Sequence, residues 1–176
     1  PQEPELTAYP ILRHPIDLYA PAGHALAGRR AIDPALLAAE PFILREPGSA
    51  TRRIAEALFA RWGIVPRVRM ELASNEAIRQ AVNDGLGLAL ISREVAESRS
   101  EGGLCALDVE GVPVIQQWYI AHARSRALPT IANAFLDYVR ANAASLQRGP
   151  ASAAAAEQAP AAPLMAVSGE ARRRGR

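Results

Sequence analysis

The sequence predicts an α/β protein whose helices cover a layered sheet. Short apolar runs of strand length alternate with segments whose apolar residues recur every three or four positions, as in an amphipathic helix. Polar or Gly/Pro-rich turns separate these runs from the helices that follow. One run, Leu88 to Ile91, is apolar throughout, as in parallel strands covered on both faces. Alternating strands and helices are typical of α/β layers.

The elements up to Gly63 rest on alternation and on turn signals. An alternating strand and loop-favouring residues come first. An Asp-Pro helix start, a short apolar run and a helix that a left-handed glycine can end then follow. In chain order the prediction is a strand over 16–20, a turn over 21–26, a short helical turn from Asp33-Pro34, a strand from Pro41, and a helix from Arg52 to Trp62 closed by Gly63.

The same pattern continues after Gly63. Residues 65–72 alternate apolar and charged side chains, the period of a strand with one covered face. The last helix has the clearest apolar stripe: Ile131, Ala134, Phe135, Tyr138 and Val139. The elements predicted here are a strand over 65–72, a helix carrying Ile78, Ala81 and Val82 that ends near Gly85, a strand over 88–91, a short helix over 94–99, strands over 104–109 and 117–122, and a helix from Pro129 to about Asn142.

The composition is that of a globular protein and argues against several kinds of site. The 176 residues are 49% hydrophobic and 22% charged, which is enough to bury a core. One cysteine, Cys105, can form no internal disulfide, and it shows no metal-ligand spacing with the three histidines. No apolar run approaches the length of a membrane span. We therefore expect a cytoplasmic protein without a metal site, a membrane segment or a resident cofactor.

The basic charge is concentrated at the C-terminal end. From Leu146 onward five arginines stand against Glu157 and Glu170, a net +3, which leaves −1 for the preceding residues. A DNA-binding face is expected to show a basic patch, and the nearly neutral body has none in its sequence. Residues 148–176 are rich in Ala, Pro, Ser and Gly, and we expect them to be disordered. Arginines within 172–176 could contact acidic partners or nucleic acid, although short charge runs are usually just solvated.

Two turns between a strand and a helix carry the candidate binding residues. Backbone N–H groups at a helix start lack intrahelical partners and, with the helix dipole, favour a carboxylate or phosphate. In α/β sheets ligands bind outside the carboxyl ends of the strands, where these turns lie. The candidates for binding a small anion are Gly48, Ser49, Thr51 and Arg52 in the first turn, and Ser74 and Asn75 in the second.

Each candidate also has a purely structural interpretation. The hydroxyl residues of both turns are the types favoured as ordinary N-caps, and Asn75 is either a cap or a ligand contact. Arg52 suits phosphate oxygens, but it can equally pair with Glu46 or remain solvated. An enzyme is not expected, because no motif sets a nucleophile such as Ser49 beside a base such as His24 or His122.

Several stretches between residues 10 and 146 follow the order of one family. They are the 21–26 turn with its histidine, Glu40-Pro-Phe42 leading to Pro47-Gly-Ser-x-Thr-Arg52, Gly85-Leu-Gly87 before an apolar strand, and Phe135-Leu136 in the closing helix. Together they resemble the effector-binding domain of the LysR-type transcriptional regulators. A narrower likeness, to the regulators of Calvin-cycle operons that encode RuBisCO, rests on Arg45-Glu-Pro-Gly-Ser-x-Thr-Arg52, Met70-Glu-Leu-x-Ser-Asn-Glu-Ala-Ile78 and Leu107-Asp-Val-Glu-Gly111 with Gln117-Trp-Tyr119.

The resemblance implies a periplasmic-binding-protein-like fold of type 2, with two α/β lobes, two crossover strands and a metabolite in the cleft between the lobes. One lobe would be complete and the other truncated. Residues 1–147 would form a partial effector-binding domain, with lobe II over about 21–118, the remnant of lobe I over about 1–15 and 122–147, crossovers at 16–20 and 119–122, and a disordered tail over 148–176.

The resemblance also implies a regulatory domain that senses a small anionic metabolite, such as a sugar phosphate or NADPH, and controls carbon-fixation (RuBisCO) genes. It implies self-association as a dimer or tetramer in the full-length protein. DNA contact would come only through the family's N-terminal domain, which is absent from this chain. The alternative is a solute-binding protein of a transporter, which shares the fold and should carry a secretion signal or lipid anchor.

We predict that the tail is dispensable for folding. Its composition cannot bury enough apolar area to offset the entropy lost on ordering. Deleting residues 148–176 should leave the melting temperature nearly unchanged in a thermal unfolding experiment. A drop of more than a few degrees would count against this prediction.

Overall fold

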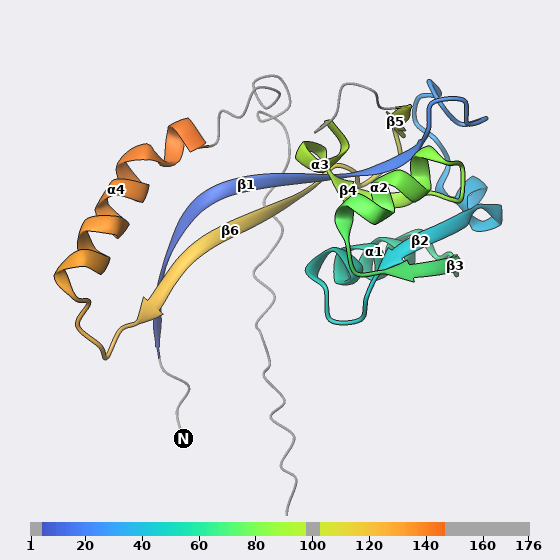
Figure 1. Cartoon of the computed structure of the whole chain (residues 1–176). Coiled ribbons are helices and arrows are strands. Elements are labelled where there is room, and N and C mark those ends of the chain that lie inside the picture. Colours follow the sequence, from blue (N-terminus) through green and yellow to red (C-terminus); the bar gives the residue numbers. More distant parts are fainter. Residues whose placement is uncertain (1–4, 98–102, 147–176) are drawn as a thin grey trace, which may run out of the picture.

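One long strand organises the chain. The computed structural model describes residues 5–97 and 103–146. Its elements, in chain order, are β1 (Leu6–Pro21), the 3-10 helix η1 (Pro34–Ala39), β2 (Pro41–Arg45), α1 (Ala50–Trp62), β3 (Arg67–Leu72), α2 (Asn75–Asn83), β4 (Ala89–Ser92), α3 (Arg93–Glu97), β5 (Leu104–Ala106), β6 (Val114–Ala123) and α4 (Thr130–Leu146). Strand β1 first forms a two-stranded ribbon with β6 and then enters a layered α/β lobe, where it pairs with β4 and β5 (Figure 1).

Strand β1 is longer than the sequence predicts. Only residues 16–20 show the alternation of a strand, and the prolines before them are unfavourable in strand interiors. The segment with Pro10 and Pro15 pairs with β6 alone, so its other edge needs no hydrogen-bond donor. The register shifts between Pro10 and Leu12, which accommodates the irregularity.

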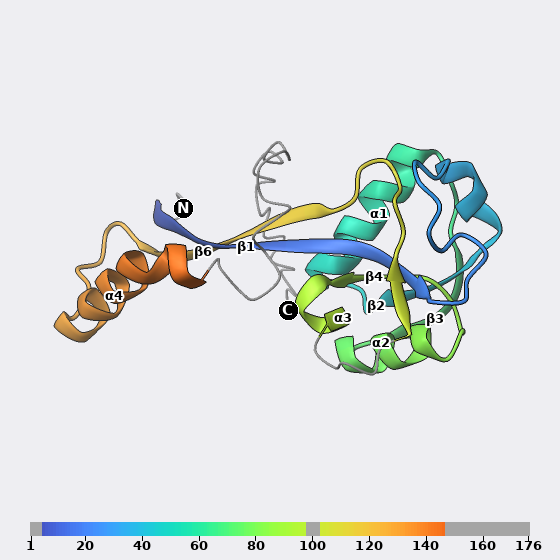
Figure 2. The same ribbon diagram turned by 90° about the horizontal axis from the view of Figure 1, so that it is seen from above.

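The predicted position of the first crossover is wrong. Residues 16–20 are buried inside the lobe, with Leu18 between Leu90 of β4 and the β5 side of the sheet. The chain leaves the lobe before Ile16, where β1 and β6 continue together as the ribbon. Figure 2 shows this ribbon spanning the distance between the lobe and α4.

The lobe contains two sheets, with the strand orders β4-β1-β5 and β2-β3, and an isolated parallel bridge between Phe42 and Leu88 places them edge to edge. Strands β2 and β3 pair in parallel. The N–H of Ile43 donates to the Leu88 carbonyl and the N–H of Leu88 donates to the Pro41 carbonyl, both at 2.8 Å, which joins β2 to the start of β4 in parallel. On its other side β4 pairs antiparallel with β1. The predicted apolar strand is therefore interior, but only one of its two neighbours is parallel.

Helices cover both faces of this layer of strands, as the continuous apolar runs predict. Successive side chains of a strand point to opposite faces. Phe42 and Leu44 accordingly join one buried cluster, whereas Ile43 between them joins the other. The first cluster contains Ala55, Leu58 and Phe59 of α1, and the second contains Ile78, Ala81 and Val82 of α2. Gly63 ends α1 in the left-handed conformation (φ 67°), which confirms its predicted role.

Helix α4 packs on the ribbon through a narrower face than predicted. Leu136 and Val139 are buried, and the Arg140 guanidinium lies 4.9 Å from the centre of the Tyr9 ring. The rest of the apolar stripe is exposed, notably Ile131, Phe135 and Tyr138. Two strands cannot cover a wide helix face. Helix α3 ends at Glu97, and the rest of the predicted 94–99 helix and the 148–176 tail lie outside the described residues.

We predict that Gly87→Ala destabilises the lobe. An added Cβ at this position would lie 2.7 Å from the Pro41 carbonyl oxygen, which receives the Leu88 hydrogen bond that joins β4 to β2. Overpacking of this kind costs ~1–3 kcal/mol. Gly23→Ala is the matched control, because its added Cβ meets nothing within 4 Å. Urea denaturation of both variants tests this, and equal midpoints would contradict the packing argument.

Candidate functional site

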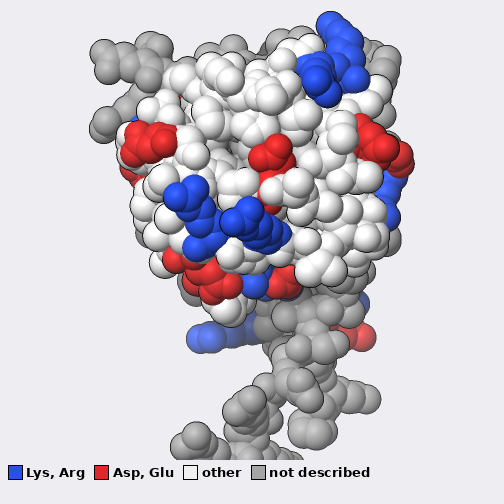
Figure 3. All heavy atoms as spheres, turned by 90° about the vertical axis from the view of Figure 1, so that its right-hand side faces the viewer, with Lys and Arg blue, Asp and Glu red and all other residues white. Residues whose placement is uncertain are grey.

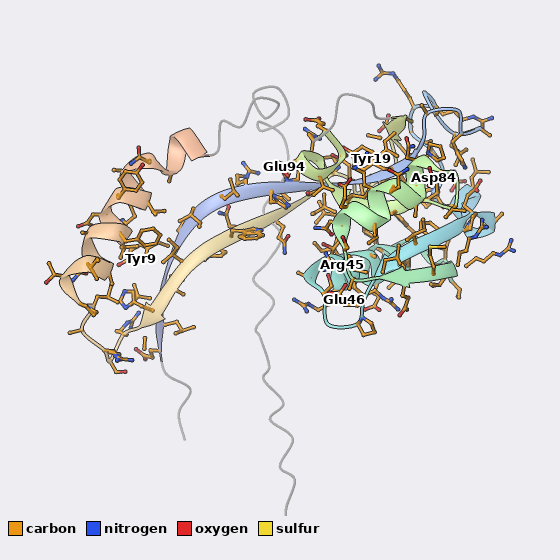
Figure 4. The ribbon with its side chains drawn as sticks, in the orientation of Figure 1. Tyr9, Tyr19, Arg45, Glu46, Asp84 and Glu94 are labelled. Carbon is orange, nitrogen blue, oxygen red and sulfur yellow. The ribbon has the colours of Figure 1, made fainter. Side chains whose placement is uncertain are left out.

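Strands β2 and β3 end side by side. Arg45, the last residue of β2, is paired with Leu72, the last residue of β3. Each strand is followed by a short turn and the start of a helix, α1 after β2 and α2 after β3. Figure 4 shows Arg45 and Glu46 at the edge of the lobe that faces the ribbon and α4. The two helix starts that the sequence singles out therefore lie at one edge of the molecule.

In the first turn, the side chain of the N-cap residue Ser49 makes no capping hydrogen bond. Gly48 takes φ 91°, a conformation that glycine adopts without strain. Ser49 occupies the N-cap of α1, and its carbonyl accepts from the N–H of Arg53 at 3.1 Å, yet its hydroxyl makes no capping bond. The interpretation of Ser49 as an ordinary N-cap is thus correct for the backbone only. Thr51 is half-buried in the first helical turn beside it.

The second turn is capped conventionally. The Ser74 hydroxyl accepts from the N–H of Ala77 at 3.3 Å, which confirms Ser74 as the N-cap of α2. Asn75 is the first residue of the helix, so its interpretation as the cap is wrong. Its Oδ1 instead accepts a hydrogen bond from Nη1 of Arg45. A side chain of the second turn is thereby tied to the strand that leads into the first.

Arg52 links three elements of the site. Its Nε donates to Glu56 at 2.7 Å, and its Nη1 donates to Glu71 of β3 at 2.6 Å and to the Arg45 carbonyl at 3.0 Å. The hydrogen bonds to Glu71 and then Glu56 raise the pKa of the Arg52 guanidinium above its ordinary value. Pairing with Glu46 or free solvation is therefore wrong for this residue, which connects α1, β2 and β3.

Arg45 is the residue of this edge that sequence reasoning missed. Its Nε and Nη2 donate to the two carboxylate oxygens of Glu46 at 2.7 and 2.9 Å, a bidentate pair. The Arg45 hydrogen bond is the largest cause that lowers the pKa of the Glu46 carboxyl. Its position in the sequence could have indicated it. Arg45 is a charged residue at the end of a buried strand, so it must lie at the same edge of the sheet as the turn that follows the strand.

An internal ion pair lies at the junction where β4 runs directly into α3. Asp17 of β1 is buried, and its Oδ2 accepts from Nε and Nη2 of Arg93 at 3.2 and 2.9 Å. Burial, reinforced by the Asp17 charge, raises the pKa of Tyr19 from its ordinary 10.0 to about 12. The ion pair ties the start of α3 to β1.

The arrangement suits binding of an anion rather than catalysis. It gathers backbone N–H groups, hydroxyls, an amide and two guanidinium groups, which are already paired with Glu46, Glu56 and Glu71. The histidines considered as bases lie elsewhere: His24 contacts Glu40 at 3.3 Å beside the opposite end of β2, and His122 belongs to β6 and stacks on Tyr9. Within residues 5–97 and 103–146, no group of three or more His, Cys, Asp or Glu is placed to hold a metal ion.

The opposite end of the lobe has a mixed surface. Figure 3 shows arginine and acidic side chains interspersed among uncharged atoms on the face at the right of Figure 1. The described residues of this face form no continuous basic patch of the kind expected for DNA binding. None of the helices in the described part of the chain is long and apolar enough to span a membrane.

The two N-cap serines should respond differently to truncation. Ser74→Ala removes a capping bond and should lower the free energy of unfolding by ~1 kcal/mol. Ser49→Ala removes a hydroxyl that makes no such bond, so its effect should stay within ~0.5 kcal/mol. Chemical denaturation of both variants measures the difference. Equal losses would mean that the Ser49 hydroxyl caps α1 in solution.

Known proteins share both the sequence and the fold. The family described as LysR substrate binding domain matches residues 1–144. A RuBisCO operon transcriptional regulator of Allochromatium vinosum is 41% identical over 147 residues, which are 83% of this chain and 49% of the relative. The HTH-type transcriptional regulator CbbR of Xanthobacter flavus is 43% identical over 135 residues, 75% of this chain and 40% of the relative. The chain thus spans about half the length of these curated relatives or less.

The fold agrees with a solved regulatory domain. The CcmR regulatory domain of Synechocystis PCC6803, solved in complex with 2-PG, superimposes with a TM-score of 0.77 at 37% identity, and the match covers 84% of this chain and 71% of that one. This likeness confirms the predicted α/β fold of the periplasmic-binding-protein type. With residues 1–144 matched by the family and relatives above 40% identity, the chain belongs to the LysR substrate binding domain family.

Proposed function

We propose that this chain is the effector-sensing part of a LysR-type transcriptional regulator that controls carbon-fixation (RuBisCO) genes in response to a small anionic metabolite. The observation that carries the proposal is the pair of helix starts at the adjacent ends of β2 and β3, one of them with a serine hydroxyl that makes no capping bond. Two sets of helix-start N–H donors at one edge favour an anion. The names of the relatives supply the regulated process.

The proposed contacts are divided among the two turns. The first turn offers backbone N–H groups together with the hydroxyls of Ser49 and Thr51, and Gly48 lets the backbone approach the ligand closely. The second turn offers the amide of Asn75, which Arg45 orients, and the hydroxyl hydrogen of Ser74. Arg52 holds the turns in register through the Arg45 carbonyl and Glu71, and its charge is already paired with Glu56 and Glu71. The proposed effector residues are thus Gly48, Ser49, Thr51, Arg52, Ser74 and Asn75.

The proposed effector class is a small phosphorylated anion. CcmR was solved with 2-PG, 2-phosphoglycolate, which carries both a carboxylate and a phosphate. Both groups are planar or tetrahedral acceptors that N–H donors and guanidinium forks recognise. Sugar phosphates and NADPH present the same phosphate chemistry. We take 2-phosphoglycolate as the first probe because it is small enough to be held by the two turns alone.

The remaining assignments rest on the family. We propose lobe II over about 21–118 together with the buried β1 segment 16–20, and a remnant of lobe I over about 1–15 and 122–147, with the proposed site facing the second lobe. The family assignment favours a cytoplasmic regulator that self-associates and does not act as an enzyme. We assign DNA contact to a helix-turn-helix domain of the kind named in the relatives.

Titration with 2-phosphoglycolate at constant ionic strength, followed by ¹H–¹⁵N NMR, tests the proposal. The amide signals of residues 49–52 and 75–77 should shift together, because both helix starts contact one ligand. Site-resolved shifts detect weak binding, so the measurement does not require the affinity of a complete two-lobed domain. Glycolate, which lacks the phosphate, should produce smaller shifts at the same concentration.

Alanine variants of the two N-cap serines, Ser49 and Ser74, test the proposed contacts in the same titration. Ser49→Ala should weaken 2-phosphoglycolate binding about tenfold, the lower end for a hydrogen bond to a charged group. Ser74→Ala removes the second proposed hydroxyl donor and should also weaken binding, and its denaturation midpoint measures separately the capping bond that it loses within α2. Shifts confined to the arginines of the tail, or spread evenly over the surface, would remove the site assignment while leaving the family assignment intact.

A further inference from the structure

The Arg45 guanidinium is held on two sides by different kinds of partner. One edge, Nε and Nη2, donates to both oxygens of the Glu46 carboxylate at 2.7 and 2.9 Å. The remaining nitrogen, Nη1, donates to Oδ1 of Asn75 in the neighbouring turn. The Nε/Nη2 edge is the flat fork with which arginine recognises carboxylate and phosphate groups in two parallel bonds. Glu46 therefore occupies the position that an anionic ligand of this arginine would take.

The two partners of the pair differ in how firmly they are anchored. The Arg45 side chain is 17% exposed, ends a buried strand and has a second contact through Asn75. The Glu46 side chain is 41% exposed, and Arg45 is the partner that holds it. Exposed ion pairs contribute little net stability, because water competes for both groups. Of the two, Glu46 is the group that can be exchanged.

We propose that Glu46 is a built-in competitor for the Arg45 fork, which an anionic effector displaces when it binds at the two turns. This inference rests on the proposed function and names the residue that sets the affinity of the site. The carboxylate or phosphate of the ligand takes over the two Arg45 bonds, and Glu46 turns to solvent. No donor is left unpaired at either stage, since each state satisfies the same fork.

Because the competitor Glu46 is a carboxylate, the site favours anionic ligands over neutral ones. A neutral ligand cannot replace a carboxylate at a charged fork without losing both charge-assisted bonds. An anion can, and the neighbouring helix starts add donors that Glu46 does not use. Glu46, like any exposed glutamate, is ionised at neutral pH, and Arg45 lowers the pKa of the Glu46 carboxyl further, so this carboxylate competes continuously. The internal carboxylate thus raises the effector concentration at which the site fills.

The test compares the Glu46→Gln variant of the full chain with the wild-type full chain in the 2-phosphoglycolate titration. Glutamine keeps the size of the side chain but removes the charge that competes. Binding at residues 49–52 and 75–77 should become about fivefold tighter, the factor that corresponds to an exposed ion pair. Glu110→Gln is the matched control: it removes the same charge from another exposed arginine pair, with Arg61 at the far end of α1. It should change the affinity less than twofold.

A double variant separates competition at the fork from a general effect of charge. In the background Arg45→Gln the fork is absent, so adding Glu46→Gln should give no further tightening. The Nε–H signal of Arg45 should shift on binding in the wild-type chain and in Glu46→Gln. Amide spectra and denaturation midpoints of each variant verify that it is folded.

The outcomes distinguish this inference from the function on which it rests. No site-specific shift in the wild-type chain would remove both. Wild-type binding without tightening in Glu46→Gln, equal tightening in Glu110→Gln, or tightening that persists in the Arg45→Gln background would each overturn the competitor alone. Tightening that requires Arg45 and is absent from the control supports it.

Discussion

The pairing of β2 between β3 and β4 is the constraint on which the rest of the lobe depends. This strand has hydrogen-bonded neighbours on both edges and helices on both faces, so neither its direction nor its register can change without exposing core residues. Phe42 and Leu44 are committed to the α1 side and Ile43 to the α2 side. Parallel pairing then brings the carboxyl ends of β2 and β3 to one edge of the lobe. The helices α1 and α2 that follow these strands therefore both start at that edge.

Much of the lobe could be predicted from local patterns, because the spacing of apolar residues in its strands and helices indicates which of their faces are buried. The apolar run at 88–91, the left-handed Gly63 and the Ser74 cap all depend on neighbours close in sequence. The full length of β1 could not be predicted, because its prolines argue against a strand and only pairing with the distant β6 stabilises it. The family, in contrast, was evident from short phrases of sequence.

The partners of the arginines show why the site itself was harder to predict. Spacing along a helix indicates Glu56 as a partner of Arg52, four residues ahead. Glu71 becomes a partner only through the pairing of β2 with β3. Arg45 was overlooked because a charged strand end has no motif of its own. As a result, the positive charges of both arginines are balanced by carboxylates of the same chain, a property that no count of net charge reveals.

Because β1 is long, the ribbon that it forms with β6 holds α4 at a distance from the lobe. Tyr9, which contacts α4 through Arg140, precedes the buried Ile16 by seven residues, so it stands roughly 23 Å from the lobe at the rise of an extended strand. A tilt of about 5° at the buried end of β1 therefore displaces the α4 attachment by about 2 Å, at the stated rise per residue.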